Sequence, residues 1–293
     1  MTTNWTLGIL GGSGLYDIEG LENPEWIHIE TPWGAPSDAI LFAELDGVKL
    51  RFLPRHGRGH KYSPSTVNYR ANIDALKRAG CTDILSLSAV GSLQEQYAPG
   101  DFVLVDQFID RTFAREKSFF GEGMVAHVSV ADPICARLSA LAGKAAKAAG
   151  AKVHNGGTYL AMEGPQFSTR AESEMYRMWG CDVIGMTNMP EAKLAREAEL
   201  PYATVAMVTD FDCWHPDHGN VDVAAVIATL MKNAQTAKGT VREIIKAMAA
   251  TPRTPSPQGI ETNLDVALIT APDARDPKML AKLDAILGRA LSR

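Results

Sequence analysis

Hydrophobic residues run almost without interruption from Tyr202 to Thr209, directly after Pro201. A run of this kind, without polar alternation, is typical of a strand that is buried on both faces in the middle of an α/β sheet. The run leads straight into Asp210 and Asp212, so the strand would deliver two carboxylates at its carboxyl end, where open α/β sheets bind their ligands. On this stretch alone, a ligand site and a solvated turn capped by an aspartate are both compatible with the pattern.

Other short apolar runs predict further strands, and the segments between them predict helices. An Asp46-Gly47 turn signal joins two of the strands as a hairpin. Strands are expected at residues 6–10, 37–45, 48–53, 83–87, 102–105, 153–162 and 182–186. Helical spacing, and a capping box at Thr169 and Glu172, predict helices at residues 64–78, 133–150, 170–180, 191–199, 221–249 and 278–291.

Because helices separate some of these strands and hairpins join others, we expect an α/β fold: a single domain with a mixed central β-sheet flanked by helices. Residues 251–259 have the proline-rich composition of a linker. The expected division is a domain over residues 1–250, followed by a Pro-rich linker and helical tail over residues 251–293. We expect the apolar face of the tail helix to dock on a neighbouring subunit or over the ligand pocket.

The composition narrows the classes of partner. The chain has 293 residues, a formal net charge of −5 and no long basic run, so we expect no nucleic-acid partner. It has no apolar run of membrane-spanning length and no signal-peptide pattern, so we expect no membrane partner. Its four cysteines form no CxxC motif and predict reduced thiols in a cytoplasmic protein. His56, His60 and His127 lack the spacing of metal ligands, so we expect no metal.

Small and polar residues follow five of the predicted strands, at Gly11–Gly14, Arg55–His56, Ser88–Ala89, Met186–Thr187 and Asp210–Asp212. If the sheet brings these ends to one edge, two kinds of binding group meet there. Hydroxyls, backbone N–H groups and an arginine suit a phosphate, which arginine can hold with two parallel hydrogen bonds. The two carboxylates suit a ligand that offers N–H groups. Phosphate and a nitrogen heterocycle together predict the phosphorolysis of a nucleoside.

These residues also have purely structural interpretations. The glycine spacing in Gly8–Gly14 matches a dinucleotide-binding fingerprint. That fold needs a helix directly after the turn, and here Gly20 and Pro24 would break such a helix. Arg55 is compatible with a surface charge. Ser88 and Thr187 are compatible with simple turn formation.

Six motifs, taken in order, resemble those of the S-methyl-5′-thioadenosine phosphorylases, in the trimeric purine nucleoside phosphorylase family. They cover roughly Leu7 to Ala249, and six weak motifs in series make a specific signal. The motifs are Gly-Gly-Ser-Gly-Leu at 11–15, Pro-Arg-His-Gly at 54–57, Val-Asn-Tyr-Arg-Ala-Asn at 67–72, Asp-Gln-Phe-Ile-Asp-Arg-Thr at 106–112, Glu-Gly-Pro-Gln-Phe-Ser-Thr-Arg-Ala-Glu at 163–172 and Thr-Asp-Phe-Asp-Cys-Trp at 209–214.

The resemblance implies the purine nucleoside phosphorylase fold and the phosphorolysis of S-methyl-5′-thioadenosine to adenine and 5-methylthioribose 1-phosphate. Inorganic phosphate would be a co-substrate, and no cofactor would be needed. By analogy with the family, Met186 would contact the ribose through its backbone. Asp210 and Asp212 would be catalytic and would bind the base, Asp210 by sharing a proton with purine N7. Phosphate would be held by Ser13, Arg55, His56, Ser88, Ala89 and Thr187.

The resemblance also predicts specificity and assembly. Relatives that prefer 6-oxopurines carry asparagine where Asp210 stands, because an amide can donate to O6, so this chain is expected to select a 6-aminopurine. His127 matches a histidine that a neighbouring subunit contributes, which implies a homotrimer. The 5′-methylthio group would meet an apolar pocket formed by Phe167, Ser168, Val221 and Val223.

The sequence departs from the family in several places. Ser13 and Ser88 replace threonines and keep the hydroxyl, Gly185 stands where eukaryotic relatives carry asparagine, and the tail is longer. Two alternatives stay open. One is a 6-oxopurine nucleoside or methylthioinosine phosphorylase, which Asp210 disfavours. The other is a non-catalytic nucleoside-binding protein, in which the phosphate donors would have no role.

Overall fold

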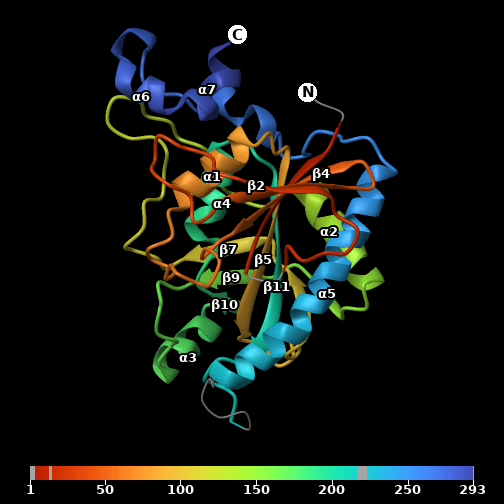
Figure 1. The fold of residues 1–293 in the computed structure, drawn as a ribbon. Helices are drawn as coiled ribbons and strands as arrows, with labels where there is room; N and C mark the ends of the chain where they lie inside the picture. Colours follow the sequence, from red (N-terminus) through yellow and green to blue (C-terminus); the bar gives the residue numbers. More distant parts are fainter. Residues whose placement is uncertain (1–3, 13–14, 217–222, 293) are drawn as a thin grey trace.

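The computed structural model of the chain describes residues 4–12, 15–216 and 223–292, and Figure 1 shows its fold. Within these residues, 11 strands form one mixed sheet in which β2-β3-β4-β1-β5-β10-β9-β7 is the main path and β11, β6 and β8 branch from β5. The strands are β1 Thr6–Gly11, β2 Glu22–Ile27, β3 Ile40–Leu45, β4 Val48–Pro54, β5 Asp83–Ser92, β6 Phe102–Leu104, β7 Gln107–Asp110, β8 Val153–Asn155, β9 Thr158–Ala161, β10 Val183–Gly185 and β11 Tyr202–Asp210.

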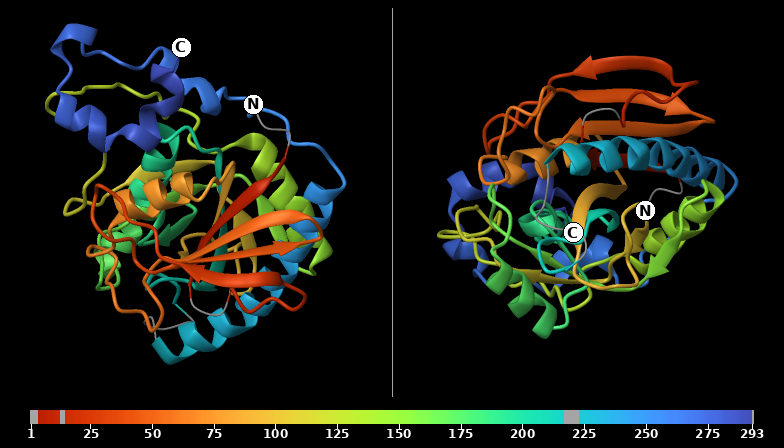
Figure 2. Two further views of the ribbon diagram at one scale, coloured as in Figure 1. Left: turned by 45° about the horizontal axis from the view of Figure 1, so that its top comes forward. Right: turned by 90° about the horizontal axis from the view of Figure 1, so that it is seen from below.

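Helices cover both sides of the sheet, which confirms the predicted α/β fold with a mixed central sheet (Figure 1). Helices α2 and α5 pack on each other and on β11. Helix α4 packs on β5 and β11 from the other side of the sheet, and α1 packs on α4. In Figure 2, strands β2, β3 and β4 are grouped at one side of the molecule, where α5 contacts β4. The helices are α1 Tyr69–Arg78, α2 Ala136–Ala148, α3 Arg170–Met178, α4 Asn188–Glu197, α5 Val223–Ala249, η1 Ile260–Asp265, η2 Pro272–Ala274, α6 Pro277–Lys282 and α7 Asp284–Leu291.

Strand β5 is central to the sheet, and strands β1 and β10 pair with different parts of the same edge of β5. Its other edge pairs with β11 in parallel from Ile84 to Gly91. On the shared edge, β1 pairs only as far as Ser86, and β10 begins pairing at Gly91. Among the described residues, Leu87–Val90 therefore have no strand beside them on that edge. The sheet therefore has a gap between the end of β1 and the end of β10.

The predicted strand 83–87 was too short. In the structure β5 continues to Ser92, so Ser88 and Ala89 lie within the strand and not in a loop after it. Small residues break the hydrophobic pattern here, but pairing with β11 through Gly91 keeps the backbone extended.

Two other predicted elements are divided. The expected strand 153–162 is interrupted by Gly156 and Gly157, whose φ angles of 81° and 140° turn the chain so that β8 and β9 pair with different partners. The expected helix 278–291 is two helices, α6 and α7, that meet at Leu283. Strands β2 and β7 were not predicted from the sequence.

The tail packs against the rest of its own chain. Leu283, Ile286 and Leu287 are buried in the main hydrophobic core, and α7 contacts α1. The linker is tied down as well, because Arg253 is only 7 % exposed and donates from Nε to Asp83 Oδ2 at 2.6 Å. This chain itself therefore buries part of the apolar face, and none of the described tail residues lines the pocket of the same chain. Docking of the rest of that face on a neighbouring subunit stays a prediction. The proposed boundary at residue 250 stays a prediction.

Candidate active site

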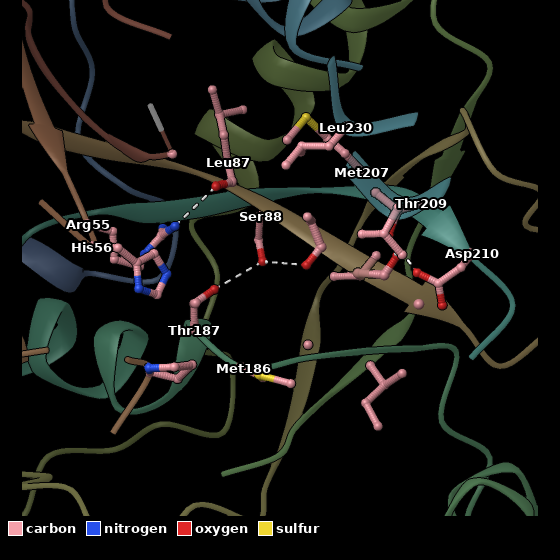
Figure 3. Close-up of a pocket in the computed structure, with 18 of the residues that line it drawn as sticks. Arg55, His56, Leu87, Ser88, Met186, Thr187, Met207, Thr209, Asp210 and Leu230 are labelled. Carbon is pink, nitrogen blue, oxygen red and sulfur yellow. Dashed lines mark hydrogen bonds between the residues drawn. The ribbon is translucent and has the colours of Figure 1, made fainter. Parts of the chain in front are cut away.

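A pocket with a volume of about 340 Å³ opens at the gap beside β5, a size within the usual range for small-molecule sites. The ends of β4, β10 and β11 meet there, and the first turns of α5 contribute Val226, Leu230 and Ala234 to its wall. Figure 3 shows polar side chains gathered around the Ser88 segment of β5. Nine of the predicted site residues line the pocket: Arg55, His56, Ser88, Ala89, Phe167, Met186, Thr187, Asp210 and Asp212.

Arg55 enters the site from the end of β4, where its backbone N–H donates to Gly11 O at 3.0 Å. The side chain is 2 % exposed, so the surface-charge interpretation is wrong. Its guanidinium fork is already used, since Nε donates to Glu191 Oε2 at 2.6 Å and Nη2 to Glu191 Oε1 at 3.0 Å. Burial alone lowers the pKa of Arg55, but the Glu191 carboxylate outweighs it and raises the pKa above its ordinary value.

This arrangement changes how Arg55 can bind an anion. Nη2 also donates to Ser86 Oγ at 2.7 Å, and Nη1 donates to Leu87 O at 3.2 Å. Because Nη1 carries two hydrogens and has one acceptor among the described residues, one N–H is left for a ligand. Arg55 in this state can offer a single hydrogen bond and a positive charge, and not the two parallel bonds that its residue type suggested.

His56 is neutral at physiological pH in this environment. Its Nδ1 lies 2.9 Å from Tyr62 O, and because a carbonyl only accepts, Nδ1 carries the hydrogen. Burial, followed by the positive charge of Arg55, lowers the pKa of His56 to about 4. Its ring stacks on His60 at 4.3 Å. The remaining nitrogen, Nε2, is therefore an acceptor for a protonated oxygen unless a bound anion draws a proton to it.

Two hydroxyls sit together between β5 and the end of β10. Ser88 Oγ lies 3.1 Å from Thr187 Oγ1 (Figure 3). It also lies 3.1 Å from the hydroxyl of Tyr159. Ser88 is nearly buried, with 2 % of its surface exposed, yet it lines the pocket. The turn-former interpretation of Ser88 is therefore wrong, because the residue is within a strand. The pair can donate to or accept from a polar ligand.

Asp210 is aimed at the pocket by a β-bulge. Val208 pairs with Val90, but Asp210 pairs with Gly91, so Thr209 is an extra residue in β11. Asp210 Oδ1 accepts from Asp212 N at 2.8 Å, and Oδ2 accepts from Thr209 Oγ1 at 2.7 Å. A Cβ at Gly91 would lie 2.9 Å from Asp210 Oδ1, so the glycine makes room for the carboxylate. Burial raises the pKa of Asp210.

Asp212 carries an unsatisfied acceptor. It is 5 % exposed, and its Oδ2 has no hydrogen-bond partner among the described residues. A buried carboxylate oxygen without a partner is costly and marks a place where a ligand can donate. Burial raises the pKa of Asp212, the Ser173 side chain opposes this rise, and the charge of Asp210 adds to it. The two aspartates thus form an acidic end of the pocket.

The remaining predicted residues lie elsewhere. Ser168 is near but not in the wall of the pocket, where its carbonyl accepts from Cys213 Sγ at 3.4 Å. His127 is exposed on a segment whose backbone N–H donates to Ala267 O at 2.9 Å, away from this chain's pocket. Ser13 and Val221 lie outside the described residues, as does the side chain of Val223. Their roles stay predictions.

Sequence reasoning missed the residues that hold the site together. Arg115 is 8 % exposed and donates to four backbone carbonyls: Met186 O at 2.7 Å, Met189 O at 2.6 Å, Glu163 O at 2.7 Å and Met162 O at 3.3 Å. It thereby fixes the loop that carries Met186. Arg115 lies in a stretch of sequence without clear periodicity, and nothing in that local pattern marks Arg115 or its distant acceptors.

The described residues contain no group of three or more His, Cys, Asp or Glu side chains arranged to hold a metal ion. No helix in the described part of the chain is long and apolar enough to cross a membrane. The pocket can bind a ligand with an anionic part near Ser88, Thr187 and Arg55, and with N–H groups near Asp210 and Asp212.

Comparison with known proteins agrees with this interpretation of the pocket. The sequence pattern of the phosphorylase superfamily matches residues 6–246. An S-methyl-5′-thioadenosine phosphorylase from Cereibacter sphaeroides is 65 % identical over 97 % of this chain and 98 % of its own length. The crystal structure of a methylthioadenosine phosphorylase from an antarctic soil metagenomic library superimposes with a TM-score of 0.91, at 48 % identity over 98 % of this chain and 100 % of that one.

A methylthioadenosine phosphorylase from Schistosoma mansoni, solved in complex with adenine, superimposes with a TM-score of 0.80 at 37 % identity, over 89 % of this chain and 96 % of that one. These similarities extend over nearly the whole chain and confirm the resemblance that the six motifs indicated. The chain belongs to the phosphorylase superfamily.

Proposed function

We propose that this chain catalyses the phosphorolysis of S-methyl-5′-thioadenosine to adenine and 5-methylthioribose 1-phosphate. The observation that carries the proposal is the pairing, in one pocket, of a buried acidic end at Asp210 and Asp212 with a hydroxyl-rich end at Ser88 and Thr187. The names of its close relatives support the same substrate.

The reaction replaces one bond to the ribose with another. A phosphate oxygen bonds to C1′, the C1′–N9 bond breaks, and its electron pair passes to the purine, which takes a proton at N7. The transition state resembles an oxocarbenium ion, which an adjacent fixed phosphate anion stabilises. No atom is oxidised or reduced overall, so phosphate is a co-substrate and the step requires no redox cofactor.

Asp210 is suited to hold the proton that the departing purine needs. A carboxyl group with an ordinary pKa is ionised at neutral pH, but burial raises the pKa of Asp210 and keeps it protonated to a higher pH. The unsatisfied Oδ2 of Asp212 accepts from an N–H of the base. A 6-amino group can satisfy an acceptor at this end of the pocket, whereas a 6-oxo group would face it unpaired.

Phosphate would bind at Ser88, Ala89 and Thr187, with Arg55 giving one N–H and a charge. Ser13, from the glycine-rich turn, belongs to the same proposed set. Without a ligand, the low pKa of His56 keeps its ring neutral, so Nε2 can accept a hydrogen bond from a protonated phosphate oxygen. Alternatively, the negative charge of bound phosphate draws a proton onto Nε2.

The 5′-methylthio group would rest on the apolar wall, to which Phe167 and Leu230 contribute, with Ser168, Val221 and Val223 as further members of the proposed subsite. His127, which is exposed, would complete the same subsite of a neighbouring subunit in a homotrimer. The four cysteines are free and buried, which supports the proposed cytoplasmic location.

One assay separates this function from its alternatives. Methylthioadenosine, adenosine, inosine and methylthioinosine are each incubated with the enzyme, with and without phosphate, and free base is measured. We expect phosphate-dependent release of adenine, fastest from methylthioadenosine. Faster release of hypoxanthine would establish a 6-oxopurine enzyme, and binding without release in any reaction would establish a non-catalytic protein. Sedimentation equilibrium, with three subunit masses as the expected result, tests the homotrimer.

A further inference from the structure

Tyr159 lies directly behind the hydroxyl-rich end of the pocket and does not line it. The residue is in β9, is 0 % exposed, and its ring packs against Phe108 with 5.6 Å between ring centroids. Its hydroxyl lies 3.1 Å from Ser88 Oγ and accepts from Thr187 N at 3.4 Å. We propose that Tyr159 is a positioning residue that turns the Ser88 hydroxyl toward bound phosphate, with Gly185 serving to admit it. The inference rests on the proposed function of Ser88.

Hydrogen counting gives the direction of this chain of bonds. A backbone N–H can only donate, so Thr187 N fills an acceptor site of the Tyr159 hydroxyl. The single hydrogen of that hydroxyl then goes to Ser88 Oγ, its other partner. Ser88 Oγ is thereby supplied with a hydrogen bond as acceptor, so its own hydrogen is donated elsewhere, to Ala89 O at 3.3 Å or to Thr187 Oγ1 at 3.1 Å. Both of these bonds are long for a hydroxyl donor, and a phosphate oxygen is a stronger acceptor than either partner. A serine that Tyr159 already holds as an acceptor can therefore pass its hydrogen bond to bound phosphate.

Gly185 is the partner that makes this placement possible. A Cβ at residue 185 would lie 2.0 Å from the Tyr159 hydroxyl oxygen and 2.6 Å from Cζ. Both distances are far below any contact between real atoms, and the obstacle is a buried ring that β9 holds in place. The tyrosine hydroxyl therefore occupies the space that any larger side chain at residue 185 would fill. The two residues form a steric pair next to the phosphate end of the pocket.

Tyr159→Phe tests the role of the hydroxyl, because it removes one atom and leaves the ring. We expect the KM for phosphate to rise about five- to tenfold, the usual effect of one organised hydrogen bond, while the KM for the nucleoside stays unchanged. Tyr97→Phe removes the same atom from a tyrosine whose ring packs on His154, and both KM values should stay as in the unaltered enzyme. An unchanged KM for phosphate in Tyr159→Phe, or an equal rise in both KM values, would overturn the inference.

Direct titration of inorganic phosphate by calorimetry gives a readout that does not need turnover. The dissociation constant should rise in Tyr159→Phe by the same factor as the KM. If the unaltered enzyme releases no base from any nucleoside, the proposed function fails. If it does so and Tyr159→Phe binds phosphate equally well, only the inference about Tyr159 fails.

The steric pair has its own test. Gly185→Ala should lower the melting temperature strongly in the presence of Tyr159, and much less when combined with Tyr159→Leu, whose side chain ends short of the hydroxyl position. Equal losses in both backgrounds would show that Gly185 is required for a reason other than Tyr159.

Discussion

Glu191 and Arg55 form a two-pronged ion pair at 2.6 Å and 3.0 Å, and both side chains are almost completely removed from solvent, at 1 % and 2 % exposure. The pair joins α4 to the end of β4, beside the pocket. Tyr202, from the central strand, donates its hydroxyl to Glu191 Oε1 at 2.8 Å and extends the network. Arg55 is therefore held in place before any ligand binds, which avoids the entropic cost of ordering it during catalysis.

Glu191→Ala should destabilise the protein severely. Removing the carboxylate leaves the charge of Arg55 buried without a counter-charge, which costs about 3–5 kcal/mol of unfolding free energy. Urea unfolding followed by circular dichroism measures this loss. Glu19→Ala serves as the matched control, since Glu19 is 91 % exposed and lies 3.8 Å from Arg242, and no measurable loss is expected there. Equal stability of the two variants would show that Arg55 does not depend on Glu191.

Asp210→Asn should reduce the preference for adenine nucleosides. An amide cannot give its proton to N7 as a carboxylic acid does, so kcat/KM for methylthioadenosine should fall by roughly 10²–10⁴-fold. The amide can donate to O6, so the ratio of the kcat/KM values for methylthioinosine and methylthioadenosine should rise. Asp46→Asn, in the β3–β4 turn, is the control and should leave both substrates unaffected. An unaltered substrate ratio in Asp210→Asn would contradict the assignment of this residue to the base.

His56 should make the protein less stable in mild acid. Its pKa is about 4 in the folded state and about 6.5 in the unfolded chain. The unfolded state therefore binds more protons between these values, and stability is lost as the pH falls from about 6.5 to 4. The loss is on the order of 3 kcal/mol. Urea unfolding at several pH values should show a flatter profile for His56→Gln than for the unaltered protein. An unchanged pH profile in His56→Gln would contradict this role of His56.

The tail should contribute to stability and leave catalysis unchanged. Leu287 is completely buried, so Leu287→Ala should cost about 2–5 kcal/mol of unfolding free energy. Leu291→Ala, one helical turn later and 43 % exposed, is the control and should have little effect. Because none of the tail residues that the structure describes lines this chain's pocket, kinetic constants at low temperature should match the unaltered enzyme in both variants. A changed KM for the nucleoside would indicate contact between tail and substrate.

The local pattern of the sequence determined most elements of the fold. The unbroken apolar run before Asp210 predicted the buried central strand, and the structure shows every residue from Tyr202 to Thr209 buried. The hairpin at Asp46-Gly47 and the capping box at Thr169 are both present. These features depend on residues within a few positions of one another, so the local sequence is enough to predict them.

Only the tertiary structure decided how the site is assembled. Arg55 and Glu191 are 136 positions apart, and Ser88 and Tyr159 are 71 apart. The unpaired edge of β5 and the bulge that turns Asp210 toward Gly91 are properties of strand pairing and not of any one strand. Hydrophobic periodicity records which residues are buried but not which strand lies beside which. The sequence thus named the groups that can bind phosphate and base, whereas packing between distant segments decided which atoms remain free to do so.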